Sequence, residues 1–221
     1  MWSWLNIRPA VLDEIIRLDG PGDVQANICG SCLDRATTPL YRCLECSYGL
    51  LFCGECVVRS HQTSPLHRLE VCLVHPRHFP PPYAHVVQCW KDGFFDRASL
   101  YSLGSVCHLG HGGATCPTSS PPRTLTIVDT NGWHKLNIRF CNCGTNTSLP
   151  EQYRQLLRMR WYPASFDRPR TAFTFDLLET YHKVTLQGKL NLYDFYLAIM
   201  HKSDNQGRSK PMVRDFYLRF Y

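Results

Sequence analysis

Four pairs of cysteine or histidine residues follow one another between residues 29 and 67, and they constrain the fold more than any other feature of the chain. Three are C-x2-C pairs and the last is a histidine pair: Cys29 and Cys32, Cys43 and Cys46, Cys53 and Cys56, and His61 and His67. Two cysteines on one tight turn can both bind zinc at about 2.3 Å, and a structural zinc ion takes four ligands in a tetrahedron. Eight donors therefore predict two zinc ions.

These four pairs can be shared between two ions in two ways. We expect the first and third pairs to bind one ion and the second and fourth pairs to bind the other. In this cross-braced arrangement the two ions cross-link the same short segment twice. The two predicted ligand sets are Cys29, Cys32, Cys53 and Cys56, and Cys43, Cys46, His61 and His67. Sequential pairing, in which the first two pairs share an ion, remains the alternative. The late histidine pair resembles ZZ-type and B-box-type fingers more than a RING finger.

A third group of donors lies further along the chain. His111 and Cys116 are followed by two segments of alternating apolar residues that flank Asn131-Gly132, a dipeptide typical of hairpin turns, and Cys141 and Cys143 come directly after them. A hairpin would return the last two cysteines to the first two donors. The predicted ligands of a third zinc ion are therefore His111, Cys116, Cys141 and Cys143, with Cys107 or His108 as possible substitutes. A closed set of four ligands is typical of a structural site.

The 12 cysteines also bear on the cellular environment. The N-terminus lacks the basic start and apolar stretch of a signal peptide, and no apolar run approaches the roughly 20 residues that span a bilayer. We therefore expect an intracellular protein with reduced thiols and no membrane segment, in which metal binding explains the cysteines better than disulfide bonds do.

The remaining patterns predict an α+β fold of small zinc-stabilised β-hairpin modules followed by a helical subdomain. Apolar segments at 40–42 and 50–52 indicate a hairpin in the double-zinc finger. Helices are expected over residues 93–104, 151–160, 171–187 and from Asn191 to Met200, with Asn191 as the N-cap. We divide the chain into an N-terminal helix or extension (1–26), a double-zinc finger (27–80), a hairpin with the third zinc site (83–145) and a helical subdomain (146–221).

Charge indicates which part of the chain contacts a polyanion. The formal net charge is +6, and three zinc ions bound by nine thiolates would lower it by about three. Residues 151–221 hold 12 Lys or Arg against 7 Asp or Glu, whereas residues 1–150 hold 12 against 11. We expect any phosphate contacts to come from five arginines of the C-terminal part, namely Arg154, Arg158, Arg160, Arg168 and Arg170.

The order of these motifs resembles the cysteine-cluster domain of the second CxC type that is associated with Kyakuja-Dileera-Zisupton (KDZ) transposases. The matching segments run from about residue 29 to the end of the chain and include Tyr41-Arg42-Cys43, Phe140-Cys141-x-Cys143, Gln155-Leu156-Leu157-Arg158 and Trp161-Tyr162-Pro163-Ala164. The resemblance implies a nuclear, transposon-derived protein whose zinc sites support DNA binding or assembly with a transposase core.

The same resemblance implies an accessory domain and not an enzyme. The chain ends at Tyr221, where the transposase body would be expected to begin. The seven acidic residues after Cys143 follow no pattern that would gather three carboxylates around two metal ions for attack on a phosphodiester. We therefore expect a chain without the catalytic core.

Two other functions fit the same residues. The double-zinc finger would carry a mild negative charge once its metals are counted, which suits a basic peptide such as a histone tail. A ubiquitin-ligase-like zinc finger is the second alternative, and the late position of the histidine pair disfavours it. Competition between short duplex DNA and basic peptides would separate peptide binding from DNA binding.

Overall fold

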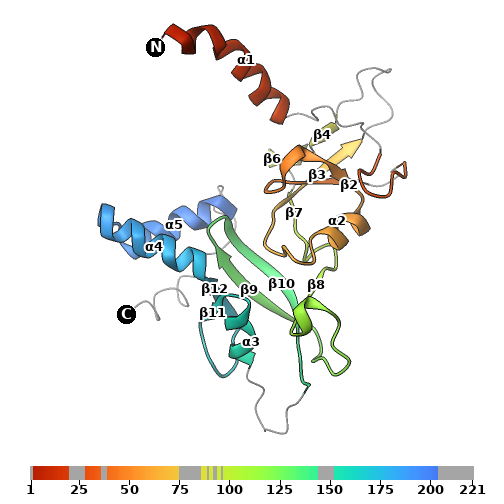
Figure 1. The fold of residues 1–221 in the computed structure, drawn as a ribbon, viewed down its shortest axis with the longest axis vertical. Coiled ribbons are helices and arrows are strands. Elements are labelled where there is room, and N and C mark those ends of the chain that lie inside the picture. Colours follow the sequence, from red (N-terminus) through yellow and green to blue (C-terminus); the bar gives the residue numbers. More distant parts are fainter. Residues whose placement is uncertain are drawn as a thin grey trace. The chain divides into compact units, whose positions relative to one another are not determined.

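The structure is a computed structural model that describes residues 2–19, 28–35, 39–74, 86–88, 90–91, 94–95, 97–143 and 152–203. The chain divides into two units, Met1–Leu103 and Gly104–Tyr221 (Figure 1). Each unit contains both helices and strands, so the predicted α+β class is confirmed. Among the described residues, no helix combines the length and the apolar character that crossing a membrane requires.

The N-terminal unit contains the helix α1 (Trp2–Asp19) and a small five-stranded sheet. Strand β1 (Leu40–Cys43) pairs antiparallel with β2 (Leu51–Phe52), as the two apolar segments predicted, and on its other side with β3 (Leu69–Val74). The remaining elements of this unit are η1 (Ser47–Gly49), α2 (Gly54–Ser60), β4 (Val86–Gln88), β5 (Trp90–Lys91), β6 (Phe94–Phe95) and β7 (Arg97–Ala98). The β1–β2 pair and α2 together place the cysteine pairs of the finger.

The helix predicted over residues 93–104 is wrong for the part of that segment that is described. Strands β6 and β7 occupy its first half, and a turn closed by a hydrogen bond from Leu103 N to Ser99 O (3.2 Å) occupies the second. Strand β7 pairs with β3, with Ala98 opposite Leu69. Leu100 is buried in the same core as Leu69. Pairing with a strand that is distant in sequence therefore outweighs the local helical pattern.

The C-terminal unit is built on a mixed sheet of five strands in the order β11-β12-β9-β10-β8. The predicted hairpin around Asn131-Gly132 is confirmed, because β9 (Arg123–Asp129) and β10 (Gly132–Phe140) pair antiparallel. Strand β8 (Val106–Leu109) runs parallel to β10, and β12 (Thr171–Thr174) runs parallel to β9. Strand β11 (Trp161–Pro163) forms the edge beside β12. The apolar residues that alternate along β10 are buried, as their spacing indicated: Leu136, Ile138 and Phe140.

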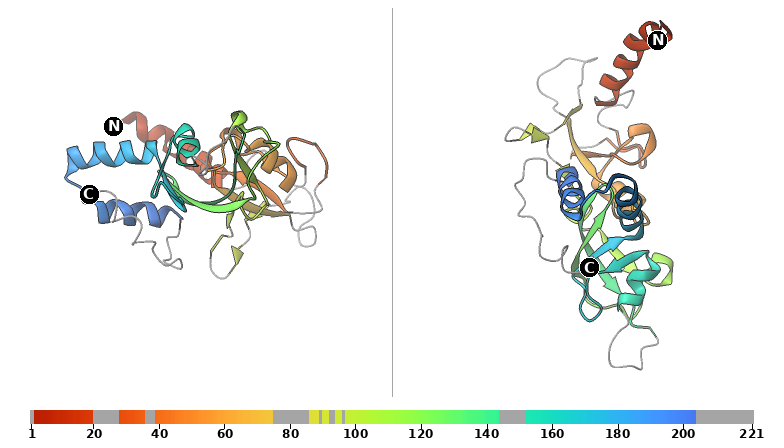
Figure 2. Two further views of the ribbon diagram at one scale, coloured as in Figure 1. Left: turned by 90° about the horizontal axis from the view of Figure 1, so that it is seen from below. Right: turned by 90° about the vertical axis from the view of Figure 1, so that its left-hand side faces the viewer.

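The described part of this unit also contains the α-helices α3 (Gln152–Arg158), α4 (Phe175–Gly188) and α5 (Leu192–Ser203). Helices α4 and α5 lie alongside each other at one end of the sheet (Figures 1 and 2), and Tyr181 of α4 packs on Phe195 of α5 with ring centres 5.1 Å apart. The Asn191 side chain accepts a hydrogen bond from Asp194 N (2.8 Å), which confirms the predicted N-cap of the last helix.

The C-terminal part is nevertheless not purely helical, contrary to expectation. Two short strands, β11 and β12, join the sheet, and the helix predicted from residue 171 begins at Phe175. All four residues of β12 are buried. The Thr174 hydroxyl accepts a hydrogen bond from Leu177 N (3.2 Å) and so caps α4. The helix therefore begins only after Thr174. The four residues before the helix are buried and belong to β12, which pairs with β9, so they form a strand.

The turn between β9 and β10 is tied to the end of α5. Trp133 N donates to the Ser203 hydroxyl (2.7 Å), and Lys202 Nζ donates to Thr130 O (2.8 Å). Gly132 has a φ of 138°, and a Cβ atom at this position would collide with the Ser203 hydroxyl. Glycine is therefore required here both by the backbone conformation and by the close approach of α5.

We expect Gly132→Ala to lower the free energy of unfolding by about 2 kcal/mol, because it adds backbone strain and separates α5 from the hairpin. Chemical denaturation of the two proteins measures the difference. Gly188→Ala is the matched control, since nothing lies within 4 Å of its added Cβ; it should leave stability unchanged or slightly raised. Equal stability of the Gly132 variant and the wild type would contradict this account of the turn.

Candidate metal centres

The first group of donors joins a loop to the start of a helix. Cys29 and Cys32 lie in a turn in which Cys29 N donates to Asp34 O (3.1 Å), while Cys53 and Cys56 lie at the N-terminus of α2. Cys53 N also donates to the Cys29 sulfur (3.3 Å). The four sulfurs lie within 4.8 Å of one another, with Cys29 and Cys56 buried and Cys32 exposed.

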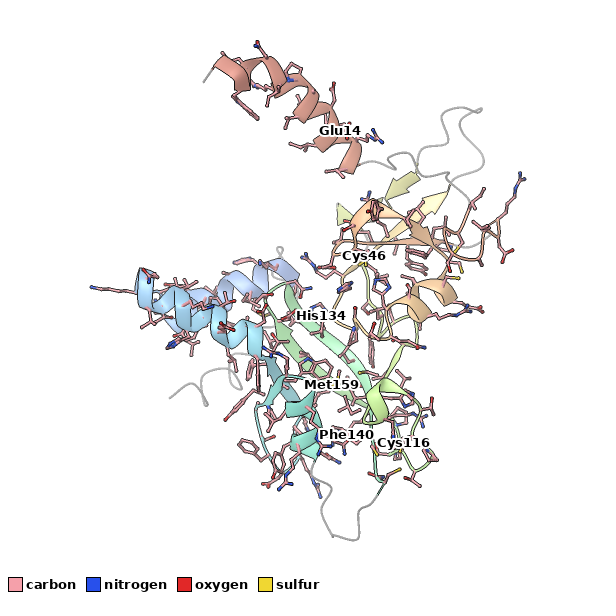
Figure 3. All side chains as sticks on the ribbon, in the orientation of Figure 1. Glu14, Cys46, Cys116, His134, Phe140 and Met159 are labelled. Atoms are coloured by element: carbon pink, nitrogen blue, oxygen red, sulfur yellow. The ribbon has the colours of Figure 1, made fainter. Side chains whose placement is uncertain are left out.

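The donors of the second group flank β2 and α2 in the sequence, with the cysteines before β2 and the histidines after α2. Cys43 ends β1, Cys46 follows it, His61 caps the C-terminus of α2, and His67 precedes β3. The Cys46 sulfur is 3.4 Å from His61 Nε2 and 3.5 Å from His67 Nδ1 (Figure 3, with Cys46 labelled). His61 Nδ1 lies 2.9 Å from Val57 O. A proton on Nδ1 donated to this carbonyl leaves Nε2 free to bind a metal.

The carboxylate of Glu45, which is not one of the four donors, stabilises the arrangement of the second group. Both oxygens of Glu45, which lies between Cys43 and Cys46, accept hydrogen bonds from Arg68: one from its backbone N (2.7 Å) and one from its Nε (2.6 Å). Arg68 follows His67 directly. The double contact therefore fixes the histidine segment against the cysteine turn.

The third group is assembled by the sheet of the C-terminal unit. Parallel pairing places Leu109 of β8 opposite Phe140 of β10, so the residues that follow the two strands meet. The Cys116 sulfur lies 3.5 Å from Cys141 and 3.4 Å from Cys143 (Figure 3, with Cys116 labelled), and the Cys141 sulfur lies 3.2 Å from His111 Nε2. These separations are close to the edge of about 3.6–3.8 Å in a tetrahedron with zinc-like bond lengths.

Two details hold this group in shape. Gly110 has a φ of 103°, and a Cβ atom there would lie 2.7 Å from the Cys141 Cβ. The Gln155 side chain of α3 accepts a hydrogen bond from Cys141 N (2.9 Å) and donates one to Cys141 O (2.8 Å). One amide thus satisfies both backbone groups of a predicted ligand and fastens α3 to the third group.

Electrostatics explains why these groups suit a cation. Burial opposes the Cys29 thiolate, but backbone N–H groups of Cys32, Cys53 and Ser31 outweigh it and lower the Cys29 pKa to about 6. The Asp34 N–H favours the Cys32 thiolate, yet the neighbouring Cys29 side chain and other effects raise the Cys32 pKa to about 12. Ionisation of one cysteine therefore makes ionisation of its neighbour less favourable. A divalent cation at the centre would remove that penalty.

All twelve residues predicted as metal ligands are brought together in three groups, and each group contains the four residues named from the sequence. The two pairs that sequential pairing would unite, Cys29 with Cys32 and Cys43 with Cys46, lie in different groups. Sulfur and imidazole donors in sets of four are consistent with zinc in closed, structural sites. A tetrahedral ion bound by all four donors of a group would have no open position for water or a substrate.

Other cysteines and histidines lie outside these groups. The third group contains His111 and not Cys107, which is buried in β8, where burial raises its pKa to about 11. His134 Nε2 is 2.7 Å from the Asn131 side-chain oxygen, which gives this histidine a role in the hairpin turn. Cys72 and Cys89 have no partner at ligand spacing in the sequence, which predicts small buried residues, and their side chains lie outside the described ones.

The five arginines expected to contact nucleic acid are all exposed, and they lie on α3 or between α3 and β12. Arg154 and Arg158 are on α3, and Arg168 and Arg170 are on the loop after β11. Arg160 lies 5.7 Å from the centre of the Phe175 ring. The sequence analysis did not single out Arg123, which begins β9. Its Nη2 donates a hydrogen bond to Pro169 O (3.1 Å) and so holds the loop between β11 and β12.

We expect Cys116→Ser to reduce the metal content from three zinc ions per chain to two, because it removes a donor of the third group. Elemental analysis of the purified proteins measures the change. Cys107→Ser, which alters a buried cysteine of the same unit outside the group, should keep all three ions. An unchanged zinc content in the Cys116 variant would contradict the assignment.

We expect Glu45→Gln to weaken zinc binding by the second group about ten-fold, because a neutral amide cannot accept both hydrogen bonds from Arg68. Competition with a chromophoric chelator measures the affinity. Glu55→Gln changes an exposed glutamate on α2 and serves as the control. If both variants released zinc at the wild-type chelator concentration, Glu45 would have no supporting role.

Comparison with known proteins bears on the C-terminal unit. Residues 100–207 match a family model described as a CxC2-like cysteine cluster associated with KDZ transposases. This range contains the third group and the five arginines, and it does not contain the double finger, although the sequence resemblance was drawn from about residue 29. No curated protein and no solved structure matches the chain. The resemblance to KDZ-associated domains is thereby confirmed over residues 100–207, which are similar to the CxC2-like cysteine cluster associated with KDZ transposases.

Proposed function

We propose that this chain is a zinc-binding, non-catalytic accessory domain of a KDZ-type transposase or of a protein derived from one, and that it helps to bind DNA or to assemble the transposase. The proposal is supported by the match of residues 100–207 to a family model whose description names an association with KDZ transposases. In this proposal three zinc ions occupy the three donor groups, the double finger of residues 27–80 is a module of its own, and the protein acts in the nucleus.

The contact between Gln155 and Cys141 carries the DNA-binding part of the proposal. Through its two hydrogen bonds, of 2.9 and 2.8 Å, α3 is fastened to the third donor group. Leu156, the next residue, is fully buried, which fixes the rotation of the helix. Arg154 and Arg158 are one turn apart and exposed on this helix. A metal ion in the third group would therefore hold two cations at a set position.

The loop between β11 and β12 adds further positive charge next to α3. Thr126 N donates to Arg170 O (2.9 Å), and the Ser165 hydroxyl donates to Arg168 O (3.2 Å), so the backbone of the loop is anchored. Residues 152–175 contain five arginines and one acidic residue, Asp167. We call Arg154, Arg158, Arg160, Arg168 and Arg170 the arginine surface. Its charge suits the phosphates of a nucleic acid.

Binding of a basic peptide by the double finger has weaker support. Residues 28–74 contain four acidic residues. Two of them are engaged within the finger, since Glu45 pairs with Arg68 (2.6 Å) and Glu70 with Arg42 (2.8 Å). Few acidic groups therefore remain to recognise a lysine-rich tail. We retain DNA as the favoured partner.

We expect the double variant Arg154→Ala/Arg158→Ala to bind a duplex of about 20 base pairs more weakly and with a smaller salt dependence. Each lost phosphate contact lowers the slope of log K against log salt concentration by about 0.9, so the slope should fall by about two. Fluorescence anisotropy at several salt concentrations measures it.

The matched control is Arg35→Ala/Arg59→Ala, which removes the same charge from two exposed positions of the finger. It should keep nearly the full salt slope. Equal losses in both variants would mean that only net charge attracts the DNA. Absence of duplex binding by the zinc-loaded wild type, or a preference for a basic peptide in competition, would contradict the proposal.

A further inference from the structure

Three aromatic side chains form a connected row beside the arginine surface. Phe166, on the loop after β11, contacts Tyr153 of α3 with ring centres 5.6 Å apart and Tyr162 of β11 with ring centres 6.1 Å apart. Both contacts are edge-to-face, at 83° and 82°. Phe166 and Tyr162 are 47% and 41% exposed, which is unusual for large rings that pack on one another. The row therefore has surface available to a ligand.

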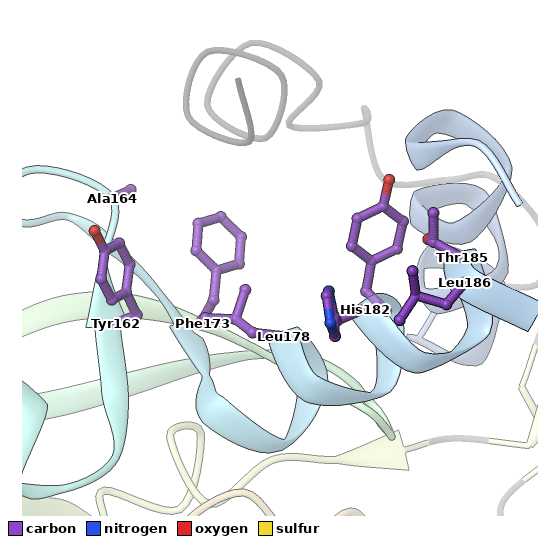
Figure 4. Close-up of a pocket in the computed structure, with 8 residues that line it drawn as sticks. Tyr162, Ala164, Phe173, Leu178, His182, Thr185 and Leu186 are labelled. Atoms are coloured by element: carbon purple, nitrogen blue, oxygen red, sulfur yellow. The ribbon is translucent and has the colours of Figure 1, made fainter. Parts of the chain in front are cut away.

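This row continues into a cavity. Tyr162 is paired with Phe173 across β11 and β12, and the two rings stand side by side on one wall of a cavity of about 390 Å³ (Figure 4). Leu178, His182 and Leu186 of α4 extend the wall along the helix. The lining is mostly apolar, and Tyr162, Tyr181, His182 and Thr185 are the lining residues that carry polar side-chain atoms. Its size and character fit a flat aromatic ring.

Positive charge accompanies the aromatic row. The Arg154 guanidinium lies 5.9 Å from the centre of the Tyr153 ring, and its Nε donates to the Tyr153 hydroxyl (3.2 Å). Arg168 and Arg170 are on the same loop as Phe166. The neighbouring acidic residue, Asp167, is the only one between residues 152 and 175. A ligand on this row would thus meet ring faces and cations together, which favours a polyanion that carries aromatic groups.

We propose that the row formed by Tyr153, Phe166 and Tyr162 is a stacking path for single-stranded nucleic acid, with an unpaired base seated in the adjoining cavity. The inference rests on the proposed function and names the form of nucleic acid that the arginine surface binds. Bases stack on exposed aromatic side chains without regard to sequence, while arginines track the phosphates. In a duplex the base faces are already stacked, so a duplex would use the arginines and leave the rings unused.

The test uses the full, zinc-loaded chain and a fluorescent oligothymidylate of about 12 nucleotides, a length within the range of single-strand sites. We expect this oligonucleotide to bind more tightly than a duplex of equal charge. Phe166→Ala and Tyr162→Ala should each weaken single-strand binding about ten-fold or more, with little effect on the duplex. Phe166→Trp should preserve it, since an aromatic face is retained.

Tyr193→Ala is the matched control, because Tyr193 lies on α5 outside the row and is also 47% exposed. It should bind like the wild type. A second comparison needs no variant: an abasic oligonucleotide with the same phosphates should bind the wild type about ten-fold more weakly than oligothymidylate.

Equal affinity for the abasic and the normal strand would overturn the stacking path, and so would normal single-strand binding by Phe166→Ala. In either case duplex binding through the arginine surface would persist, and the proposed function would stand. Failure of the wild type to bind any nucleic acid would overturn both.

Discussion

The three donor groups are the feature on which the rest of the structure depends. Each gathers four side chains whose donor atoms lie within 4.8 Å of one another, from segments that are up to 32 residues apart in the third group. Without a cation, one thiolate raises the cost of forming the next, as the separated pKa values of Cys29 and Cys32 illustrate. A bound divalent ion reverses the sign of this interaction. It converts a repulsive cluster into a cross-link, which compensates for the small apolar cores of the finger.

The third group links metal binding to the surface that we propose for nucleic acid. Cys141 and Cys143 follow β10. The side-chain amide of Gln155 on α3 forms hydrogen bonds with both the backbone N–H and the backbone carbonyl of Cys141. The helix that carries Arg154 and Arg158 is thus positioned by a predicted metal ligand. The arginines, the aromatic row and the cavity all belong to elements between α3 and α4. In this account the metal has a structural role and the partner is bound by side chains that do not touch it.

Local spacing allowed the donor groups to be predicted. C-x2-C turns, the late histidine pair and the Asn131-Gly132 hairpin are signals within a few residues, and the twelve donors meet in the predicted sets. The N-cap of α5 at Asn191 follows from equally local chemistry. The local spacing predicts helix for the residues of β7 and β12, and this prediction is wrong. Their pairing partners, β3 and β9, lie far away in sequence, so local spacing carries no signal of the pairing. Residue spacing also does not predict the roles of Gln155 and Phe166. These roles depend on contacts with residues elsewhere in the fold, Cys141 for Gln155 and Tyr153 for Phe166.

Hydrogen exchange of the zinc-loaded and the chelated chain, both under reducing conditions, tests the central claim most directly. The backbone N–H of Cys53 is bonded to the Cys29 sulfur, and that of Cys141 to Gln155, so each reports on one donor group. We expect both amides to be protected with zinc, to exchange fast after chelation, and to regain protection when zinc is restored. Equal protection of the two amides with and without metal would show that the fold does not depend on these groups binding a cation.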